Sequence, residues 1–144
     1  MDFNDYIQFA NEHPVCYLAT LDGDQPRVRT LLLWFADQTG FYFATLSPKD
    51  MSKQLKNNPK IELCFYNSPA DINQSKQMRI MGKAEFVDNE ELHNRILKER
   101  KFLADLVGRP LDDVTEVFRI TSGEAHFWTF ADILKEKELE RLNF

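Results

Sequence analysis

The sequence predicts a mainly β protein, a small antiparallel β-barrel with helices at its periphery. Three observations favour this fold. Short runs of aromatic and β-branched residues recur along the chain, turn signals separate them, and helical patterns occur only at the two ends and in two insertions. At 144 residues the chain fits one domain, residues 1–144. Closing its strands into a barrel would leave no unpaired sheet edge.

The first half of the chain reads as one helix, three strands and a second helix. Apolar residues recur at helical spacing over residues 2–13, and Pro14 ends that pattern. Strands are expected over residues 15–20, 27–35 and 41–45, joined by tight turns as an antiparallel meander. Ser47 suits an N-cap and Pro48 the first helical position, so a short helix is expected to follow and to end at Pro59.

The second half continues the same alternation of strands and insertions. A strand is expected over residues 60–66, and a long one over 76–87 with Gly82 at a bend or bulge. A helix is expected over residues 89–106. Two last strands over residues 117–121 and 125–130 flank a turn at Ser122-Gly123, and the charged tail from residue 131 to 144 is expected to be helical. The total is six or seven antiparallel strands.

Composition excludes several classes of function. The formal net charge of −5 argues against general nucleic-acid binding, which requires a positive field. No apolar run reaches the length of a membrane span, and the N-terminal residues have no signal core, so a cytoplasmic protein is expected. Cys16 and Cys64 lie in strand-like runs and are expected to be buried thiols. The three histidines show no metal-ligand spacing, so no metal site is expected.

One grouping of residues could bind an anion. The stretch PRVRTLLLWF enters an apolar strand through Arg27 and Arg29, which alternation places on one face. If this strand pairs with the next, Arg29 and Thr30 come close to Thr45, Ser47 and Lys49 at the start of a helix. Free N–H groups there would favour a phosphate. Solvated arginines and a simple helix cap remain the alternative explanation. Nucleotide-binding loops and nucleophile motifs are absent, and no side chain is assigned as catalytic.

Longer segments resemble a known family in order and spacing. These segments are CYLATLDGDQPRVRTLLLWF, FYFATLSPKDMSKQLKNNPKIELCFY and QMRIMGKAEFVD. They are similar to the FMN-binding split-barrel family that includes pyridoxamine 5′-phosphate oxidase, in particular its small bacterial nitroimidazole-resistance and general-stress members. The resemblance covers residues 14–88 well. It implies a six-stranded antiparallel split barrel that forms a homodimer with FMN at the subunit interface.

The resemblance also implies which residues bind the cofactor. Arg29 would meet the phosphate, the backbone after it would run beside the isoalloxazine ring, and Lys49 and Lys53 are candidate phosphate ligands. The implied FMN-binding residues are Arg29, Thr30, Leu31, Leu32, Leu33, Ala44, Thr45, Lys49, Lys53 and Gln77. Trp34 stands where the true oxidases have lysine, and their C-terminal Arg/His substrate signature is not found. Vitamin B6 oxidation is therefore not expected.

The leading hypothesis is an FMN-dependent oxidoreductase that reduces a small aromatic substrate, nitro- or quinone-like. The alternative is a non-catalytic carrier or sensor of flavin, deazaflavin or haem, with His13 or His126 available to haem. A single-stranded nucleic-acid barrel is a third reading, which the negative charge opposes. A homodimer is expected, with Trp34, Phe65 and Trp128 as candidate interface residues.

Overall fold

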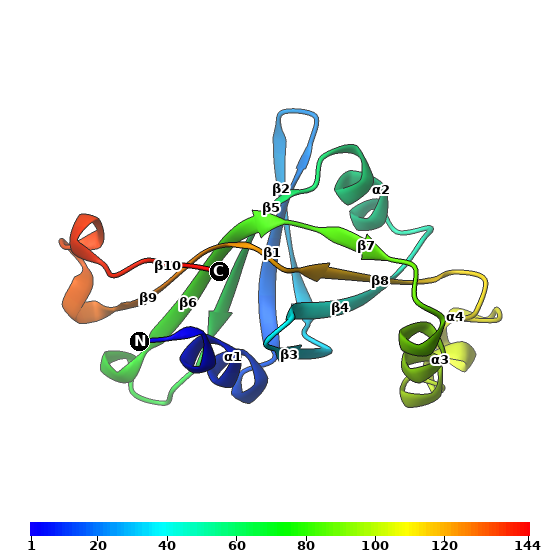
Figure 1. The fold of residues 1–144 in the computed structure, drawn as a ribbon, viewed down its shortest axis with the longest axis horizontal. Helices are drawn as coiled ribbons and strands as arrows, with labels where there is room; N and C mark the ends of the chain where they lie inside the picture. The colour runs from blue at the N-terminus through cyan, green and yellow to red at the C-terminus, as the bar shows by residue number, and fades with distance from the viewer.

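The computed structural model describes all 144 residues and contains two antiparallel sheets (Figure 1). The six-stranded sheet has the order β10-β9-β6-β5-β1-β2, and the four-stranded sheet has the order β3-β4-β8-β7. The strands are β1 (Val15–Asp22), β2 (Gln25–Leu32), β3 (Phe35–Asp37), β4 (Gly40–Leu46), β5 (Lys60–Tyr66), β6 (Lys76–Lys83), β7 (Glu85–Val87), β8 (Thr115–Ile120), β9 (Gly123–Thr129) and β10 (Leu142–Asn143). The mainly β, barrel-like prediction is confirmed.

The helices lie at the edges and in the insertions. They are α1 (Phe3–Glu12), α2 (Asp50–Asn57), α3 (Glu90–Glu99) and α4 (Leu103–Val107), with 3₁₀ turns at Ile72–Gln74, Phe130–Asp132 and Glu136–Glu138. The α3–α4 pair lies at one end of the long axis of the molecule, and the turns between β9 and β10 lie at the other (Figure 1). None of the helices combines the length and the apolar character needed to cross a membrane.

Two strands predicted as continuous are each divided between the two sheets. The strand expected over residues 27–35 ends as β2 at Leu32, and the chain resumes in the other sheet as β3. Between them, the Leu33 N–H donates to the Pro14 carbonyl at 2.8 Å and the Trp34 N–H to the Tyr42 carbonyl at 2.9 Å. The long strand over residues 76–87 divides in the same way at Ala84, between β6 and β7. The chain therefore passes from one sheet to the other at Leu33–Trp34 and at Ala84, and we call the line along which the two sheets meet the seam.

One apolar core joins the two sheets. Twenty-one buried residues form it, drawn from both sheets, α1 and α2. Phe41 of β4 in one sheet packs near Phe65 of β5 in the other, with ring centroids 6.3 Å apart, and both side chains are fully buried. Each such phenylalanine contributes about 1.5–3 kcal/mol through burial. Packing in this shared core therefore holds the two sheets against each other along the seam.

Close backbone approach explains two glycines. Gly82 of β6 is paired with Gly123 of β9. A Cβ on Gly123 would lie 2.1 Å from the Met81 carbonyl oxygen, and one on Gly82 would lie 2.8 Å from the Ser122 carbonyl oxygen. The bend or bulge expected at Gly82 thus corresponds to a place where only hydrogen fits between strands.

Three expectations about helices are wrong. Ser47 does not cap α2: its N–H donates to the Val114 carbonyl at 2.7 Å, which holds Ser47 in a turn, and Lys49 occupies the N-cap position without a side-chain cap. The helix expected over residues 89–106 is interrupted between α3 and α4.

The charged tail from residue 131 is not one helix either. Leu142 pairs with Ala125 of β9, and Phe144 stacks on Phe3 at 5.0 Å. Strand pairing and aromatic burial therefore override the helical pattern.

Candidate functional site

Two adjoining hollows lie at the seam. The first, called the seam pocket, has a volume of about 320 Å³ and is lined mainly by apolar side chains of β2, β4, α3 and α4. Its lining residues are Thr30, Leu31, Leu32, Ala44, Thr45, Leu46, Lys49, Ile96, Leu97, Arg100, Leu103, Leu111 and Thr115. The second, called the arginine pocket, has a volume of about 660 Å³ and contains Arg27, Arg29 and Asp50. Thr30 and Lys49 line both, so the pockets are neighbours.

Alternation along β2 puts different chemistry on its two sides. Val28, Thr30 and Leu32 are exposed, whereas Arg29 and Leu31 are half-buried, as the period of two requires. β2 belongs to the six-stranded sheet and β4 to the other, so the two do not form the hairpin that the sequence suggested. The hairpin partner of β4 is β3, with Phe35 paired to Tyr42. Thr30 and Thr45 nevertheless line the same pocket, because the seam brings both strands to it.

Arg29 is held by the protein itself. Its Nη1 donates to the Thr20 hydroxyl at 2.7 Å and to the Leu18 carbonyl at 3.3 Å, and its Nη2 donates to Gln54 Oε1 at 2.6 Å. Burial lowers the pKa of the Arg29 guanidinium, and the charge of Arg27 lowers it further. The guanidinium remains charged, and with five donors it keeps N–H groups that these acceptors do not use. The site thus holds a fixed, partly desolvated cation.

Thr45 carries an unsatisfied polar atom. Its side chain is 5% exposed, and its hydroxyl oxygen has no hydrogen-bond partner. Leaving a buried hydroxyl unpaired costs about 1–3 kcal/mol, so such groups usually have a reason. Here the residue lines the seam pocket. A bound ligand with a donor or acceptor at that point would satisfy the hydroxyl.

Two cations in the seam pocket are also unpaired. Lys49 is exposed, Arg100 is half-buried, and neither side chain forms an ion pair or a hydrogen bond within the chain. Burial lowers the pKa of Arg100. Sequence reasoning missed Arg100 because it lies in an insertion, far along the chain from the other site residues. Its approach to Thr45 and Lys49 depends on the docking of α3 against β8, which the sequence does not reveal.

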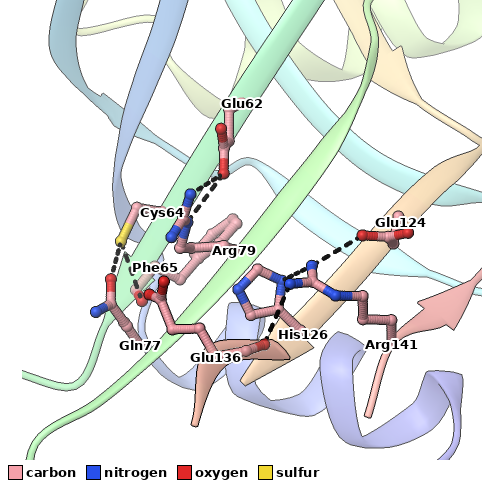
Figure 2. Close-up of polar contacts among 9 residues, drawn as sticks. All are labelled: Glu62, Cys64, Phe65, Gln77, Arg79, Glu124, His126, Glu136 and Arg141. Carbon is pink, nitrogen blue, oxygen red and sulfur yellow. Dashed lines mark hydrogen bonds and ion pairs between the residues drawn. The ribbon is translucent and has the colours of Figure 1, made fainter. Parts of the chain in front are cut away.

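Three of the expected FMN-binding residues lie outside both pockets. The Leu33 side chain is buried in the core, and Lys53 is exposed on α2. Gln77 is on β6, where its Oε1 accepts a contact from the Cys64 thiol at 3.3 Å (Figure 2). Strands β1 and β5 separate β6 from β2, a span of roughly 14 Å at the usual strand spacing. Within one chain, Gln77 is therefore remote from the seam pocket.

The aromatic residues considered for the interface differ in position. Phe65 is fully buried, so it cannot contact a partner, and that expectation is wrong. Trp34 packs on α3: its Nε1 donates to Glu99 Oε2 at 2.5 Å, and the Arg95 guanidinium lies 4.8 Å from its ring centroid. The hydrogen bond from Trp34 lowers the pKa of Glu99, and the bond from Arg95 adds to the effect.

A second polar cluster occupies the outer face of the six-stranded sheet (Figure 2). Arg79 donates twice to Glu62, and Arg141 pairs with Glu124 at 2.9 Å. Arg141 also lies 3.3 Å from His126 Nδ1. Because a guanidinium can only donate, Nδ1 accepts and the proton sits on Nε2. In this arrangement His126 offers no free lone pair to an iron atom.

A third hollow has different properties. It measures about 750 Å³ and lies over the Gly82–Gly123 pair, but only four of its fourteen lining residues are hydrophobic. Eight of the thirteen residues of the seam pocket are hydrophobic. Small-molecule sites are mostly apolar with a few convergent polar groups. The seam pocket, with its unpaired hydroxyl and two unpaired cations, therefore fits a ligand better.

Comparison with known proteins places the chain in a family. A family model described as "Pyridoxamine 5′-phosphate oxidase" matches residues 5–129. The chain belongs to the pyridoxamine 5′-phosphate oxidase family. This confirms the resemblance found in the sequence. Two pyridoxine/pyridoxamine 5′-phosphate oxidases are similar to it, one from Rippkaea orientalis at 34% identity over 70 residues and one from Bordetella petrii at 36% over 88 residues.

Those matches are partial. They cover 49% and 58% of this chain, but only 31% and 40% of the two oxidases. The chain thus spans about a third of one oxidase and two fifths of the other.

Similar solved structures cover more of the chain. A NimC/NimA family protein from Clostridium acetobutylicum superposes with a TM-score of 0.75 at 27% identity, covering 98% of this chain and 92% of the other. General Stress Protein 26 from Bacillus anthracis gives 0.73 at 16% identity, covering all of both chains. A haem-binding protein from Mycobacterium smegmatis gives 0.70 at 13% identity, covering 94% of this chain and 55% of that one. The last two establish the shared fold alone.

Proposed function

We propose that the protein binds FMN at the seam and acts as a flavin-dependent oxidoreductase on a small aromatic substrate, nitro- or quinone-like. Members of its family commonly bind FMN. The observation that carries the proposal is the pairing of two neighbouring pockets, one apolar with an unpaired buried hydroxyl and the other rich in arginine. FMN has the same two parts, a flat aromatic ring and a phosphate.

The residues divide between these two parts. The walls of the seam pocket, including Leu31, Leu32 and Ala44, would contact the ring, and the Thr45 hydroxyl would gain a partner. In the arginine pocket, Arg29 and Lys49 would bind the phosphate. Charge-assisted hydrogen bonds to phosphate are about twice as strong as neutral ones. Asp50 in the same pocket repels an anion, so the cations must outweigh it.

When bound, FMN supplies the redox chemistry by accepting and donating hydride. The chain's own residues would orient the ring and exclude water from it. Apolar side chains of α3 and α4, such as Ile96 and Leu103, line the wall opposite β2 and β4. A flat substrate would have to enter beside that wall. This favours small aromatic compounds.

The site is proposed to be completed by a second subunit. The outer face of the six-stranded sheet leaves five large apolar side chains exposed: Val15, Tyr17, Val28, Leu32 and Met81. Exposed apolar side chains gathered on one face of a sheet favour an interaction site. A homodimer through this face would also bring Gln77 of the partner subunit toward the flavin. The Gln77 of the same chain lies too far from the seam pocket to reach it.

A haem- or flavin-carrier role is the second candidate, since one similar structure is a haem-binding protein. The neutral His126, held by Arg141, opposes iron ligation at that residue. The absorption spectrum of the purified protein tests both readings. Yellow protein that releases FMN, and whose flavin NADH or NADPH reduces, supports the oxidoreductase. Bound flavin that neither donor reduces supports a carrier, and a Soret band supports haem. Colourless protein that does not bind added FMN refutes the proposal.

Pyridoxamine 5′-phosphate oxidation is not part of the proposal. Trp34 takes the place of a lysine of the true oxidases, and here its indole is committed to Glu99 and Arg95 of α3. We expect no pyridoxal phosphate above background when the FMN-loaded protein is incubated with pyridoxamine phosphate and oxygen. Formation at ordinary enzymatic rates would show that the missing lysine is not required.

A further inference from the structure

The segment between β9 and β10 exposes apolar side chains although its backbone is well held. We call residues 130–140 the C-terminal arm. Asp132 anchors its start, accepting from the Thr129 N–H at 2.9 Å and the Thr129 hydroxyl at 3.0 Å. Yet Ile133 is 64% exposed and Leu134 is 93% exposed. An ordered segment that presents aliphatic side chains to water has the character of a binding surface.

A matching surface lies at the other end of the molecule. The helical pair α3–α4 exposes Phe102 at 64% and Leu106 at 78%, beside the seam pocket that Leu103 and Arg100 line. Figure 1 shows the arm and the helical pair at opposite ends of the long axis. One chain therefore cannot cover its own helices with its own arm.

The C-terminal end of the helical pair and the arm carry opposite net charges. Residues 98–109 carry four basic and two acidic side chains, a net charge of +2 in a chain whose total is −5. The C-terminal arm carries four acidic and two basic side chains, a net charge of −2. Lys98, Lys101, Glu136 and Glu138 make no ion pair within the chain. Opposite potentials of this kind select partners and fix their orientation.

Symmetry turns this complementarity into a specific arrangement. In the six-stranded sheet, β2 forms one edge and β9–β10 the other. Two copies that pack face to face about a two-fold axis parallel to the strands place each β9–β10 edge over the partner's β2 edge. An axis running across the strands would instead pair like edges, setting the two basic segments, residues 98–109, together and the two acidic arms together. Electrostatics therefore favours the first axis.

We propose that the C-terminal arm of one subunit docks on α3–α4 of the partner subunit and closes the seam pocket. Leu134 and Ile133 cover the exposed Phe102 and Leu106 of the partner subunit, while Glu136 and Glu138 meet Lys98 and Lys101. Each flavin site then has a wall from the other chain. The inference rests on the homodimer of the proposed function and adds which segment of the partner completes the pocket.

Cross-linking tests the contact directly. In a Cys64→Ser background, Leu106→Cys and Leu134→Cys together should give a covalent dimer with oxidised glutathione, reversed by dithiothreitol. Either single variant should give none, because the two arms lie at opposite ends of the dimer. Asp24→Cys with Leu106→Cys is the matched control, since Asp24 is in the exposed β1–β2 turn. Cross-linking by the control as readily as by the test pair would overturn the proposal.

Charge reversal gives an independent measurement that does not depend on a disulfide. Lys98→Glu with Lys101→Glu, or Glu136→Lys with Glu138→Lys, should each raise the dimer dissociation constant about tenfold at low salt, by sedimentation. The quadruple variant should recover most of the loss. Monomeric wild-type protein would refute the dimer itself. A wild-type dimer that binds FMN but shows neither cross-link nor charge rescue would refute only the arm contact.

Discussion

Replacing Arg29 by alanine gives the sharpest test of where a phosphate binds. A hydrogen bond to a charged group contributes about 1.5–3 kcal/mol, and each 1.4 kcal/mol is about tenfold in affinity. Arg29→Ala should therefore weaken FMN binding roughly ten- to a hundredfold. Riboflavin has the same ring and no phosphate, so its affinity should change little. Arg29→Lys should recover part of the loss, because the charge stays and the forked donor geometry is lost.

The hydrogen bonds of Arg29 also indicate how much Arg29→Ala should destabilise the ligand-free protein. Arg29 donates to Thr20, Gln54 and the Leu18 carbonyl. Gln54 Oε1 keeps a second donor, the Thr20 hydroxyl at 2.6 Å, so the substitution leaves this oxygen satisfied. Because the lost donor is a charged guanidinium, the free energy of unfolding should fall by about 1.5–3 kcal/mol, the value of one hydrogen bond to a charged group. Urea unfolding of the two proteins without ligand measures it.

Flavin fluorescence titration on the folded variants decides the role of Arg29. Arg27 is the matched control: it lies two residues earlier on β2, lines the same pocket and pairs with Asp22 in solvent at 3.4 Å. Arg27→Ala should change FMN affinity by less than Arg29→Ala does. Higher salt should weaken FMN more than riboflavin, because only FMN depends on the charges. Equal losses of FMN and riboflavin in Arg29→Ala would remove this residue from the phosphate site.

Three further predictions concern single positions. Thr45→Val removes the unpaired buried hydroxyl, so the ligand-free protein should gain about 1–2 kcal/mol in urea unfolding while FMN affinity falls; a loss of stability would mean that the hydroxyl has a partner. Burial lowers the pKa of His126, and the charges of Arg141 and Arg79 lower it further. The unfolded chain therefore takes up the proton at a higher pH than the folded chain does, near the ordinary histidine pKa of about 6.5. The free energy of unfolding should fall as the pH drops below about 6.5. His126→Gln should flatten that part of the stability–pH profile, and an unchanged profile would exclude the histidine as its cause. Gly123→Ala should cost about 1–3 kcal/mol, since its Cβ would meet the Met81 carbonyl oxygen at 2.1 Å; a wild-type unfolding midpoint would contradict this close approach.

Local sequence signals predicted most of the elements but not how the strands are shared between sheets. The expected strands over residues 15–20 and 60–66 correspond to β1 and β5, where burial alternates along the chain because one face of each strand meets the core. The breaks at Leu33–Trp34 and at Ala84 have no turn residue to mark them. They arise from hydrogen bonds to distant carbonyls, those of Pro14, Tyr42 and Pro59, which only the folded chain brings together.

Part of the candidate site could be located from the sequence. Six of the residues that the family pattern names as FMN contacts line the seam pocket, namely Thr30, Leu31, Leu32, Ala44, Thr45 and Lys49, and their binding of FMN stays a prediction. Arg100 could not be found, because its position depends on how an insertion docks. Gln77 shows the reverse limit: the family pattern names it as a flavin contact, but within one chain it lies on β6, away from the seam pocket.

The seam has a consequence for how such a site can change over time. Two of its walls, β2 and β4, are strands whose inner side chains belong to a shared core, so substitutions there disturb both sheets. The third wall, α3–α4, is an insertion between β7 and β8 that docks on the outside of the fold. Its inner face is tied to the four-stranded sheet through Ile96, which packs with Tyr42 of β4 and Val117 of β8, but its outward-facing residues can change at little cost to strand pairing. A fold built in this way can keep two walls of a pocket fixed and alter the third, and with it the ligands that fit, by substitutions in one helical insertion.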